Sequence, residues 1–253
     1  MLADYIRQRR KDRDILLMTH IVAGYPSFDD SLRIVEQMVE GGVDLMELQI
    51  PFSEPIADGP VILHANQQSL DAGSTVDRCF EFAEAVCQRF EIPFVLMTYY
   101  NILFRFGVDA FADRMTAAGL RGAIVPDLPP EEAGDYLTEM KRNRLDPIFI
   151  FSPNTTDSRM KLISERAEGF IYCVARKGVT GAETSFTEEF QSYLTRCRSS
   201  TGLPLALGFG VKDASDVSFL RGQVDVAVIG TETLRVVDRH GVEAVRPFIE
   251  SLR

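Results

Sequence analysis

The sequence has 253 residues and a formal net charge of −10, from 27 Lys and Arg against 37 Asp and Glu. This length is long for a β-sandwich and short for two ordinary domains, so we expect a single domain that covers residues 1–253. The acidic balance, without a long basic run or a basic stripe on any predicted helix, argues against nucleic acid or an anionic membrane as the main partner.

The sequence favours a cytoplasmic location. No apolar run approaches the roughly 20 residues that a membrane-spanning helix needs, and the first residues lack the apolar segment and small-residue cleavage site of a signal peptide. The four cysteines have no C-x-x-C spacing, which is typical of reduced thiols. The three histidines are far apart in the sequence, so we predict no metal site.

Short apolar runs alternate with longer stretches of helical periodicity along the whole chain. The predicted strands are residues 15–22, 44–50, 92–98, 121–126, 146–151, 169–174, 203–208 and 224–229. The predicted helices are residues 27–40, 75–90, 108–118, 130–143, 157–167, 186–199, 213–221 and 232–252. Ser27 can cap the first of these helices, and Pro130 suits the first turn of the fourth.

Eight strands that alternate with helices predict a parallel sheet covered on both faces. So many units in one chain favour an α/β fold of the closed (β/α)8 type, the TIM barrel, over an open doubly wound sheet. The chain length also lies near the typical value of about 250 residues for such barrels. In a barrel of this type the functional residues come from the carboxyl ends of the strands and from the loops that follow them.

Two carboxylates stand out at this predicted functional end. Glu47 interrupts the apolar strand 44–50, and a buried carboxylate costs free energy unless it is paired or protonated. A carboxyl group in such a site can exchange protons near neutral pH, although a structural ion pair is the alternative. Asp58 precedes Gly59 and could be an ordinary turn residue, so its predicted role depends on a partnership with Glu47.

Two glycine-containing loops predict a binding site for an anion, and a third could form a lid. The segments GFG at 208–210 and IGTET at 229–233 end the last two strands and lead into helices, where backbone amides can bind phosphate oxygens. Ordinary strand-to-helix turns are the alternative, but loops after strands seven and eight form the recurrent phosphate site of these barrels. The polar loop 175–185, which follows strand six, is either a mobile lid or a solvated connector.

The motifs resemble those of the tryptophan synthase alpha subunit family. The segment MELQIPFSEPIADGPVI at 46–62 is similar to the family signature, whose usual form is E-L-G-[IV]-P-F-S-D-P-x-A-D-G-P. The resemblance continues along the chain with AGYPSFDDSL, MTYYNILFRFG, VPDLPPEE, RKGVTGAE, GFGV and IGT, each after the expected strand. Order and spacing both fit the family.

The resemblance implies a carbon-carbon lyase that cleaves indole-3-glycerol phosphate to indole and glyceraldehyde 3-phosphate by a retro-aldol reaction. No cofactor is expected in this chain; a beta subunit that carries pyridoxal phosphate would receive the indole, in an alpha-beta-beta-alpha heterotetramer. Loops 52–60 and 99–108 would face that subunit. The carried-over residues are Glu47 and Asp58 as catalytic groups, and Tyr172, Thr180, Gly181, Gly210, Gly230 and Thr231 as substrate-binding groups.

Several residues depart from the family pattern. Gln49 replaces a glycine on the same side of the strand as Glu47, and His20 replaces a phenylalanine expected against the indole. Tyr25 and Glu54 each replace an aspartate, and Glu232 adds a negative charge beside the predicted phosphate site. These departures, above all Gln49, His20 and Glu232, lead to the hypothesis that turnover is impaired.

Two other functions are compatible with parts of this pattern. A catalytically weak barrel could act mainly as an allosteric activator of the beta subunit, because the predicted interface loops are intact while residues of the predicted pocket differ. A different phosphate-binding barrel, such as a sugar-phosphate isomerase or decarboxylase, would account for the glycines. It would give no reason for the segment from Glu47 to Asp58.

Overall fold

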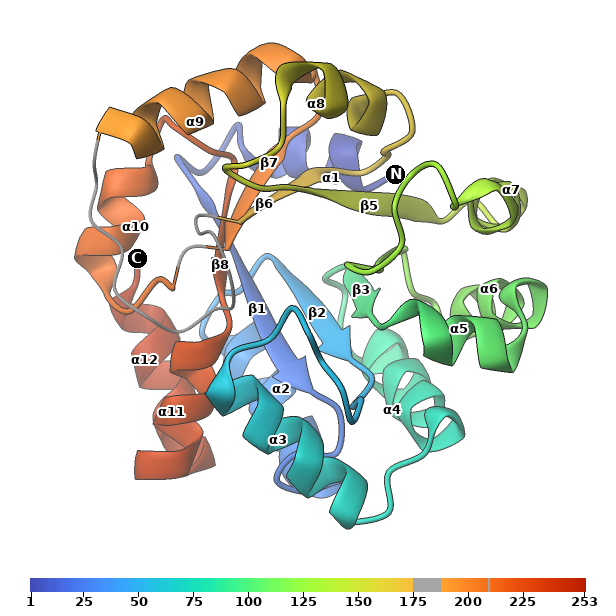
Figure 1. Ribbon diagram of the computed structural model, residues 1–253. Helices are drawn as coiled ribbons and strands as arrows, with labels where there is room; N and C mark the ends of the chain where they lie inside the picture. The colour runs from blue at the N-terminus through green and yellow to red at the C-terminus, as the bar shows by residue number, and fades with distance from the viewer. Residues whose placement is uncertain (175–187, 209) are drawn as a thin grey trace.

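Eight parallel strands form a closed barrel in the computed structural model, which describes residues 1–174, 188–208 and 210–253. Each strand pairs with its neighbours in sequence, and the eighth pairs with the first (Figure 1). The strands are β1 Leu16–Val22, β2 Leu45–Gln49, β3 Phe94–Met97, β4 Gly122–Ile124, β5 Asp146–Phe151, β6 Ile171–Val174, β7 Leu205–Gly208 and β8 Val226–Ile229. The predicted (β/α)8 fold is therefore confirmed, and each strand end lies within two residues of its predicted position.

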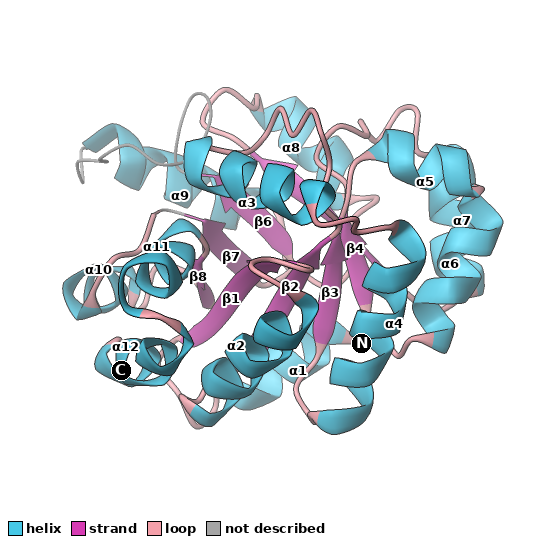
Figure 2. Cartoon of the chain, turned by 90° about the horizontal axis from the view of Figure 1, so that it is seen from below, coloured by secondary structure: helices cyan, strands magenta, loops and turns pink. Residues whose placement is uncertain are grey.

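Helices surround the strands (Figure 2). They are α1 Leu2–Arg9, α2 Phe28–Glu40, α3 Pro60–Asp71, α4 Val76–Arg89, α5 Tyr100–Phe106, α6 Val108–Ala117, α7 Gly134–Arg142, α8 Asp157–Ser164, α9 Glu188–Ser200, α10 Ala214–Leu220, α11 Thr231–His240, the 3₁₀ turn η1 Val242–Ala244 and α12 Val245–Ser251. Ser27 caps α2 as predicted, because its side chain accepts a hydrogen bond from the Asp30 amide.

The helix predictions were wrong in three respects. Helices α1, α3 and α5 were not predicted: α3 has an irregular apolar pattern with Asn66 and Ser69 buried, and the aromatic-rich α5 has no side-chain cap. The fourth predicted helix, α7, begins at Gly134 and not at Pro130, because a turn follows the two prolines. The predicted helix 232–252 is two helices, since Gly241, at φ 79°, ends α11 in a left-handed conformation.

Side chains that point into the barrel are apolar at the amino end of the strands and include polar groups at the carboxyl end. At the amino ends of the strands, Leu16 and Met18 of β1 and Leu45 of β2 pack with Leu2 and Ile6 of α1, which covers this end of the barrel. The intervening residues of the same strands pack outward against the helices. Because alternate residues of a strand share a face, the next inward positions on β1 and β2 carry polar side chains at the carboxyl end.

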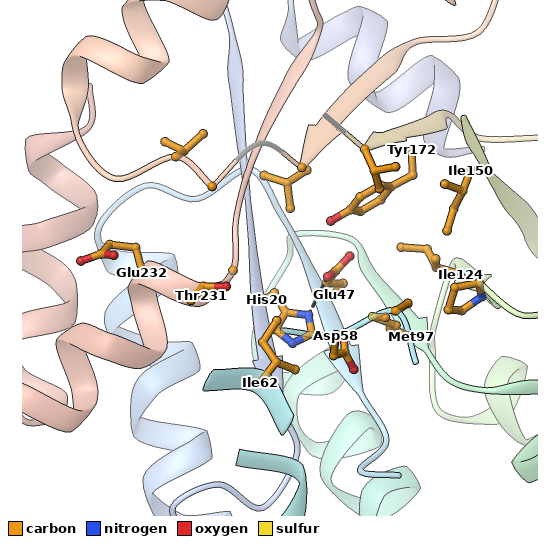
Figure 3. A pocket seen from close by; sticks show the side chains of 18 of the residues that line it. His20, Glu47, Asp58, Ile62, Met97, Ile124, Ile150, Tyr172, Thr231 and Glu232 are labelled. Atoms are coloured by element: carbon orange, nitrogen blue, oxygen red, sulfur yellow. Dashed lines mark hydrogen bonds and ion pairs between the residues drawn. The ribbon is translucent and has the colours of Figure 1, made fainter. Parts of the chain in front are cut away.

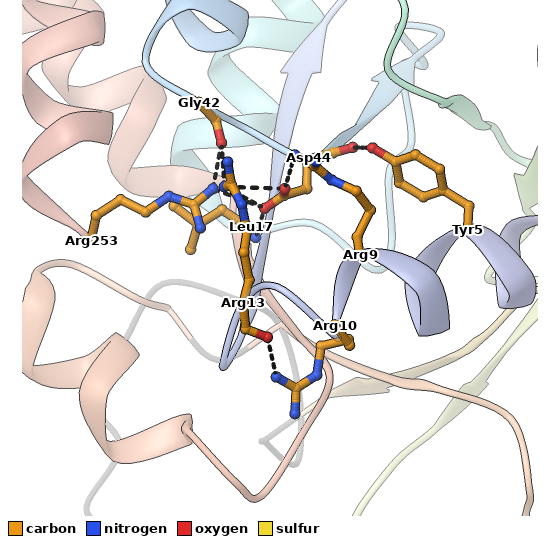
Figure 4. A network of polar contacts seen from close by, with 8 residues as sticks. All are labelled: Tyr5, Arg9, Arg10, Arg13, Leu17, Gly42, Asp44 and Arg253. Carbon is orange, nitrogen blue, oxygen red and sulfur yellow. Dashed lines mark hydrogen bonds and ion pairs between the residues drawn. The ribbon is translucent and has the colours of Figure 1, made fainter.

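Asp44, which immediately precedes β2, is a buried anion at the amino end of the barrel (Figure 4). Three guanidinium groups approach its carboxylate, at 3.2 Å from Arg9, 3.2 Å from Arg13 and 2.8 Å from Arg253. The backbone N–H of Leu17 donates to the same carboxylate at 3.0 Å. The site therefore ties the first helix, the first two strands and the carboxyl-terminal residue together.

We predict that Asp44→Asn destabilises the protein strongly. Removing one partner from a buried ion pair leaves uncompensated charge and typically costs about 3–5 kcal/mol. The free energy of unfolding, measured with urea, should fall by an amount in this range. Asp14→Asn is the matched control, because the exposed Asp14 is 4.0 Å from Arg221 at the surface. Equal stability of the two variants would contradict a dominant role for Asp44.

No helix in the described part of the chain is both long enough and apolar enough to span a membrane.

Candidate active site

A cavity of about 870 Å³, including its open mouth, lies at the carboxyl ends of the strands (Figure 3). Its apolar wall includes Met97, Ile124 and Ile150 from consecutive strands. Its polar groups include Glu47 and Asp58, so the structure brings together the two carboxylates singled out in the sequence. A mostly apolar pocket with a few convergent polar groups is the usual form of a small-molecule site.

Glu47 is paired with His20 inside this cavity. The two residues are Cα partners in the β1–β2 register, and His20 Nδ1 lies 2.6 Å from Glu47 Oε1. Both side chains are almost completely buried, with 2% of each residue exposed. Burial opposes the charged imidazolium, but the carboxylates of Glu47 and Asp58 outweigh it and raise the pKa of His20 above its ordinary value. The structural ion pair considered for Glu47 therefore involves a histidine and not a lysine or arginine.

The second atom of each group in this pair has no partner among the residues that the structure describes. Glu47 Oε2 and His20 Nε2 are buried and make no hydrogen bond to any described residue. Buried polar atoms without partners are uncommon in folded proteins and call for an explanation. Because both residues line the cavity, these two atoms are available to a bound molecule.

Asp58 reaches the cavity from the loop between β2 and α3. Two donors hold its Oδ2, Gln49 Nε2 at 2.7 Å and the Tyr99 hydroxyl at 3.2 Å. Tyr99 in turn accepts a hydrogen bond from the Ala57 amide at 3.1 Å. Burial raises the pKa of Asp58, and the nearby His20 and the two donors offset part of this rise. The two carboxyl groups thus have different surroundings, as a pair with divided tasks requires.

Gln49 does not occupy the cavity. Its side chain is fully buried beneath Asp58, where it also approaches Asn66 Oδ1 at 3.4 Å. Asn66 accepts a hydrogen bond from the Phe52 amide at 2.8 Å, so these side chains fix the loop that carries Asp58. The sequence analysis named Gln49 as a departure on the same side of the strand as Glu47, and the structure shows that it is a hydrogen-bond donor to Asp58.

The far wall of the cavity is formed by Tyr172 of β6, whose hydroxyl points into the same space (Figure 3). Burial, and then the negative charges of Glu47 and Asp58, raise the pKa of this phenol, which is therefore a neutral hydrogen-bond donor. A Cβ atom on Gly208 would lie 2.8 Å from the Tyr172 ring. Glycine at the end of β7 is thus required for the tyrosine to pack here.

The predicted anion site lies on the same cavity, at the carboxyl ends of β7 and β8. Gly210, Gly230 and Thr231 all line it, and α11 begins at Thr231. Gly210 has a φ of 75°, a conformation that favours glycine. The start of a helix thus lies at the cavity, beside the glycines for which the sequence predicted an anion site.

Glu232, which the sequence placed beside this anion site, is paired with Arg235 at 3.1 Å. Its side chain points away from His20 and Glu47 (Figure 3). Arg235 and Lys212 also line the cavity on this side. The negative charge of Glu232 is thus opposed by a neighbouring cation.

The remaining residues singled out in the sequence are either not described or do not line the cavity. Thr180 and Gly181 fall outside the described residues, as does the rest of loop 175–185. Tyr25 does not line the cavity; its hydroxyl donates to Asp238 of α11 at 2.7 Å. Glu54 is exposed on the loop before Asp58.

The sequence analysis missed the role of three site residues. The pairing of His20 with Glu47 could have been expected from the predicted alignment of the first two strands, because both residues occupy inward positions near the carboxyl end. The contact between Tyr99 and Asp58 depends on how far the proline-rich loop folds back, which no local pattern indicates. Arg235 follows Glu232 at helical spacing, and this spacing predicts an ion pair.

A closed (β/α)8 barrel with paired carboxylates at the carboxyl ends of its strands places the chain in the class of barrel enzymes. The family profile described as tryptophan synthase alpha chain matches residues 6–248. A tryptophan synthase alpha chain from Desulforapulum autotrophicum is 61% identical over 252 residues, which cover 100% of both chains. This chain therefore belongs to the tryptophan synthase alpha chain family.

Solved structures agree with this assignment. A chain from the structure of Mycobacterium tuberculosis tryptophan synthase has a TM-score of 0.93 and 30% identity, with 99% of this chain and 96% of that chain covered. A chain from the crystal structure of the Pyrococcus furiosus tryptophan synthase complex has a TM-score of 0.86 and 29% identity, with 94% and 97% covered. The similarity thus extends over nearly the whole length of each chain.

We predict that Asp58→Asn increases the stability of the fold at neutral pH, because it removes a charge that burial disfavours. The raised pKa of Asp58 means that its contribution to stability is fully present below the ordinary carboxyl pKa and is lost as the pH rises through the folded-state value. The difference in melting temperature between the variant and the wild type should therefore increase with pH over this window. A difference that stays constant, or that decreases with pH, would contradict the role of burial.

Proposed function

We propose that this chain cleaves indole-3-glycerol phosphate to indole and glyceraldehyde 3-phosphate. The observation that supports it most directly is that Glu47 and Asp58 meet at one apolar cavity. Each of the two carboxyl groups is held there by a close hydrogen bond to one of its oxygens. The flat, apolar indole suits the walls formed by aliphatic side chains and Tyr172. Membership of the tryptophan synthase alpha chain family supports the same reaction.

The reaction requires two proton transfers and a redistribution of charge. One proton is delivered to indole C3, and one is removed from the side-chain hydroxyl next to the bond that breaks. The electrons of the O–H bond then form the aldehyde, and the carbon-carbon bond pair returns to the ring, which regenerates indole. Glu47 would exchange these protons through Oε2. Asp58 would accept a hydrogen bond from the ring N–H and stabilise the positive charge that develops there.

The phosphate would bind at the opposite side of the cavity. Gly210, Gly230 and Thr231 would provide backbone amides at the start of α11, and Arg235 and Lys212 would add positive charge nearby. Thr180 and Gly181 are proposed to contribute from the loop outside the described residues. Tyr172 would contact the substrate between these two ends.

We also propose that the chain acts together with a beta subunit that carries pyridoxal phosphate, in an alpha-beta-beta-alpha heterotetramer. The Pyrococcus furiosus relative is described as a tryptophan synthase complex, which supports a partner. Two large apolar side chains are exposed near the mouth of the barrel, Ile56 at 73% and Phe104 at 69%. They belong to the two predicted interface loops, and apolar surface of this kind is typical of a site that a partner covers.

The hypothesis of impaired turnover now depends on fewer residues. Gln49 hydrogen-bonds Asp58, and Glu232 is paired with Arg235, so neither leaves an unpaired charge or fills the cavity centre. His20 is the departure that contacts Glu47, the proposed proton-transfer group, and also lines the cavity. The alternative function, activation of the beta subunit by a weak barrel, would be supported if beta-subunit activity with free indole rose while no indole-3-glycerol phosphate was cleaved.

We predict that Glu47→Gln reduces kcat for cleavage by about 100- to 10,000-fold, the usual contribution of a general acid or base. The amide keeps the size of the side chain but cannot exchange the protons. Formation of glyceraldehyde 3-phosphate, measured with the beta subunit present, would report the rate. Glu81→Gln, at an exposed position on α4, is the matched control and should retain wild-type activity. Equal activities of these two variants would exclude Glu47 as the catalytic carboxyl.

We predict that Phe104→Asp weakens binding of the beta subunit at least tenfold, because a charge would have to be buried in an apolar contact. Titration calorimetry with the beta subunit would give the dissociation constant. Lys11→Asp, an exposed change close to the opposite end of the barrel, is the control. If both variants bound as tightly as the wild type, the partner would contact another surface.

A further inference from the structure

The contact between His20 and Glu47 places a titratable ring directly against the proposed catalytic carboxyl. The family resemblance leads us to expect a phenylalanine at this position. The pair is the closest polar contact in the cavity among the described residues, at 2.6 Å. The ring cannot be explained as a surface group, because only 2% of His20 is exposed. Its role in the reaction is therefore a question that the proposed function leaves open.

We infer that His20 is a positioning residue, which holds Glu47 by Oε1 and so makes Oε2 the oxygen that exchanges protons with the substrate. The inference rests on the proposed function, because it assigns a role within the same reaction. It differs from the expectation drawn from the sequence, in which His20 merely takes the place of an aromatic wall and impairs turnover.

The geometry restricts the carboxyl group to one orientation. Parallel pairing aligns the backbone of His20 with that of Glu47, so the two side chains leave adjacent strands side by side. A hydrogen bond from Nδ1–H to Oε1 then opposes rotation of the carboxyl about its last torsion, which is otherwise broad. The other oxygen, Oε2, remains without a partner among the described residues and belongs to the cavity lining. A phenylalanine at this position would offer no donor, and the carboxyl would be free to turn.

The charges that face His20 favour a proton shared with Glu47. Glu47 lies on the neighbouring strand, Asp58 lies on the loop above, and the Tyr172 phenol faces both carboxylates from β6. Lys212 and the pair of Glu232 and Arg235 line the same cavity, on the side of α11. Because the pKa of His20 is raised, its imidazolium form persists to a higher pH than that of an ordinary histidine, and loss of the Nε2 proton still leaves Nδ1–H to donate to Oε1.

Two substitutions separate positioning from a merely structural role. His20→Phe removes the donor, whereas His20→Asn keeps an N–H group close to the position of Nδ1 but cannot titrate. We expect His20→Phe to lower kcat about 10- to 100-fold, the range found where a partner that orients a metal-binding side chain is lost. The KM should change little, because the phosphate and indole contacts remain. His20→Asn should restore kcat to within a few-fold of the wild type.

The pH profile gives a second measurement. In the wild type, kcat should show an inflection where the imidazolium of His20 loses its charge beside Glu47, and this inflection should be absent in His20→Asn. His64→Phe, the same chemical change at an exposed histidine of α3 outside the cavity lining, is the matched control and should leave kcat and the profile unchanged. If His20→Phe kept the wild-type kcat and pH profile, the inference would be wrong.

A measurement without substrate distinguishes this inference from the proposed function. Nuclear magnetic resonance of the imidazole nitrogens should show that the titration midpoint of His20 falls in Glu47→Gln, because the negative charge that raises it is removed. An unchanged midpoint would overturn the pairing even if the protein cleaves indole-3-glycerol phosphate. If the wild type does not cleave that substrate, while the midpoint falls as expected, the proposed function fails and the His20–Glu47 pair still stands.

Discussion

Strict alternation of side chains along closed parallel strands is the constraint on which the rest of this structure depends. Once the apolar residues Leu16 and Leu45 face the interior at the amino end, the alternation directs His20 and Glu47 to the interior at the other end. The apolar core and the candidate site are therefore two halves of one interior. A shift of β2 by one residue would turn Glu47 outward towards the helices and remove the site.

The polar half of this interior is compatible with folding because its charges have partners. His20 holds Glu47, and Gln49 and Tyr99 hold Asp58. The partners do not remove the cost of burial completely, as the raised pKa of Asp58 shows. At the amino end, by contrast, the buried carboxylate of Asp44 is surrounded by three arginines and a backbone amide. In the cavity wall, Glu47 Oε2 and His20 Nε2 are left without partners among the described residues, and this is where a ligand is expected.

Much of the fold and part of the site could be predicted from the sequence. The eight strands were predictable because short apolar runs recur between helical stretches, and the glycines after β7 and β8 indicated where an anion could bind. Helix α3 was missed because it buries Asn66 and Ser69, so its inward face does not look apolar. The role of Gln49 was not predicted, because it depends on a contact to a loop that no local pattern contains, whereas the role of His20 required the first two strands to be aligned with each other.

Helix α1 limits the routes by which small molecules can enter and leave the barrel. Its side chains Leu2 and Ile6 fill the amino end of the barrel, and Asp146 anchors the helix by accepting a hydrogen bond from the Leu2 amide at 2.7 Å. Below the cavity the interior is packed with buried aliphatic side chains, so the described residues offer a ligand no passage in that direction. Under the proposed function, a product formed beside Glu47 would leave by the mouth of the cavity, and a partner that receives an apolar product would sit over that mouth, on the side where Ile56 and Phe104 are exposed.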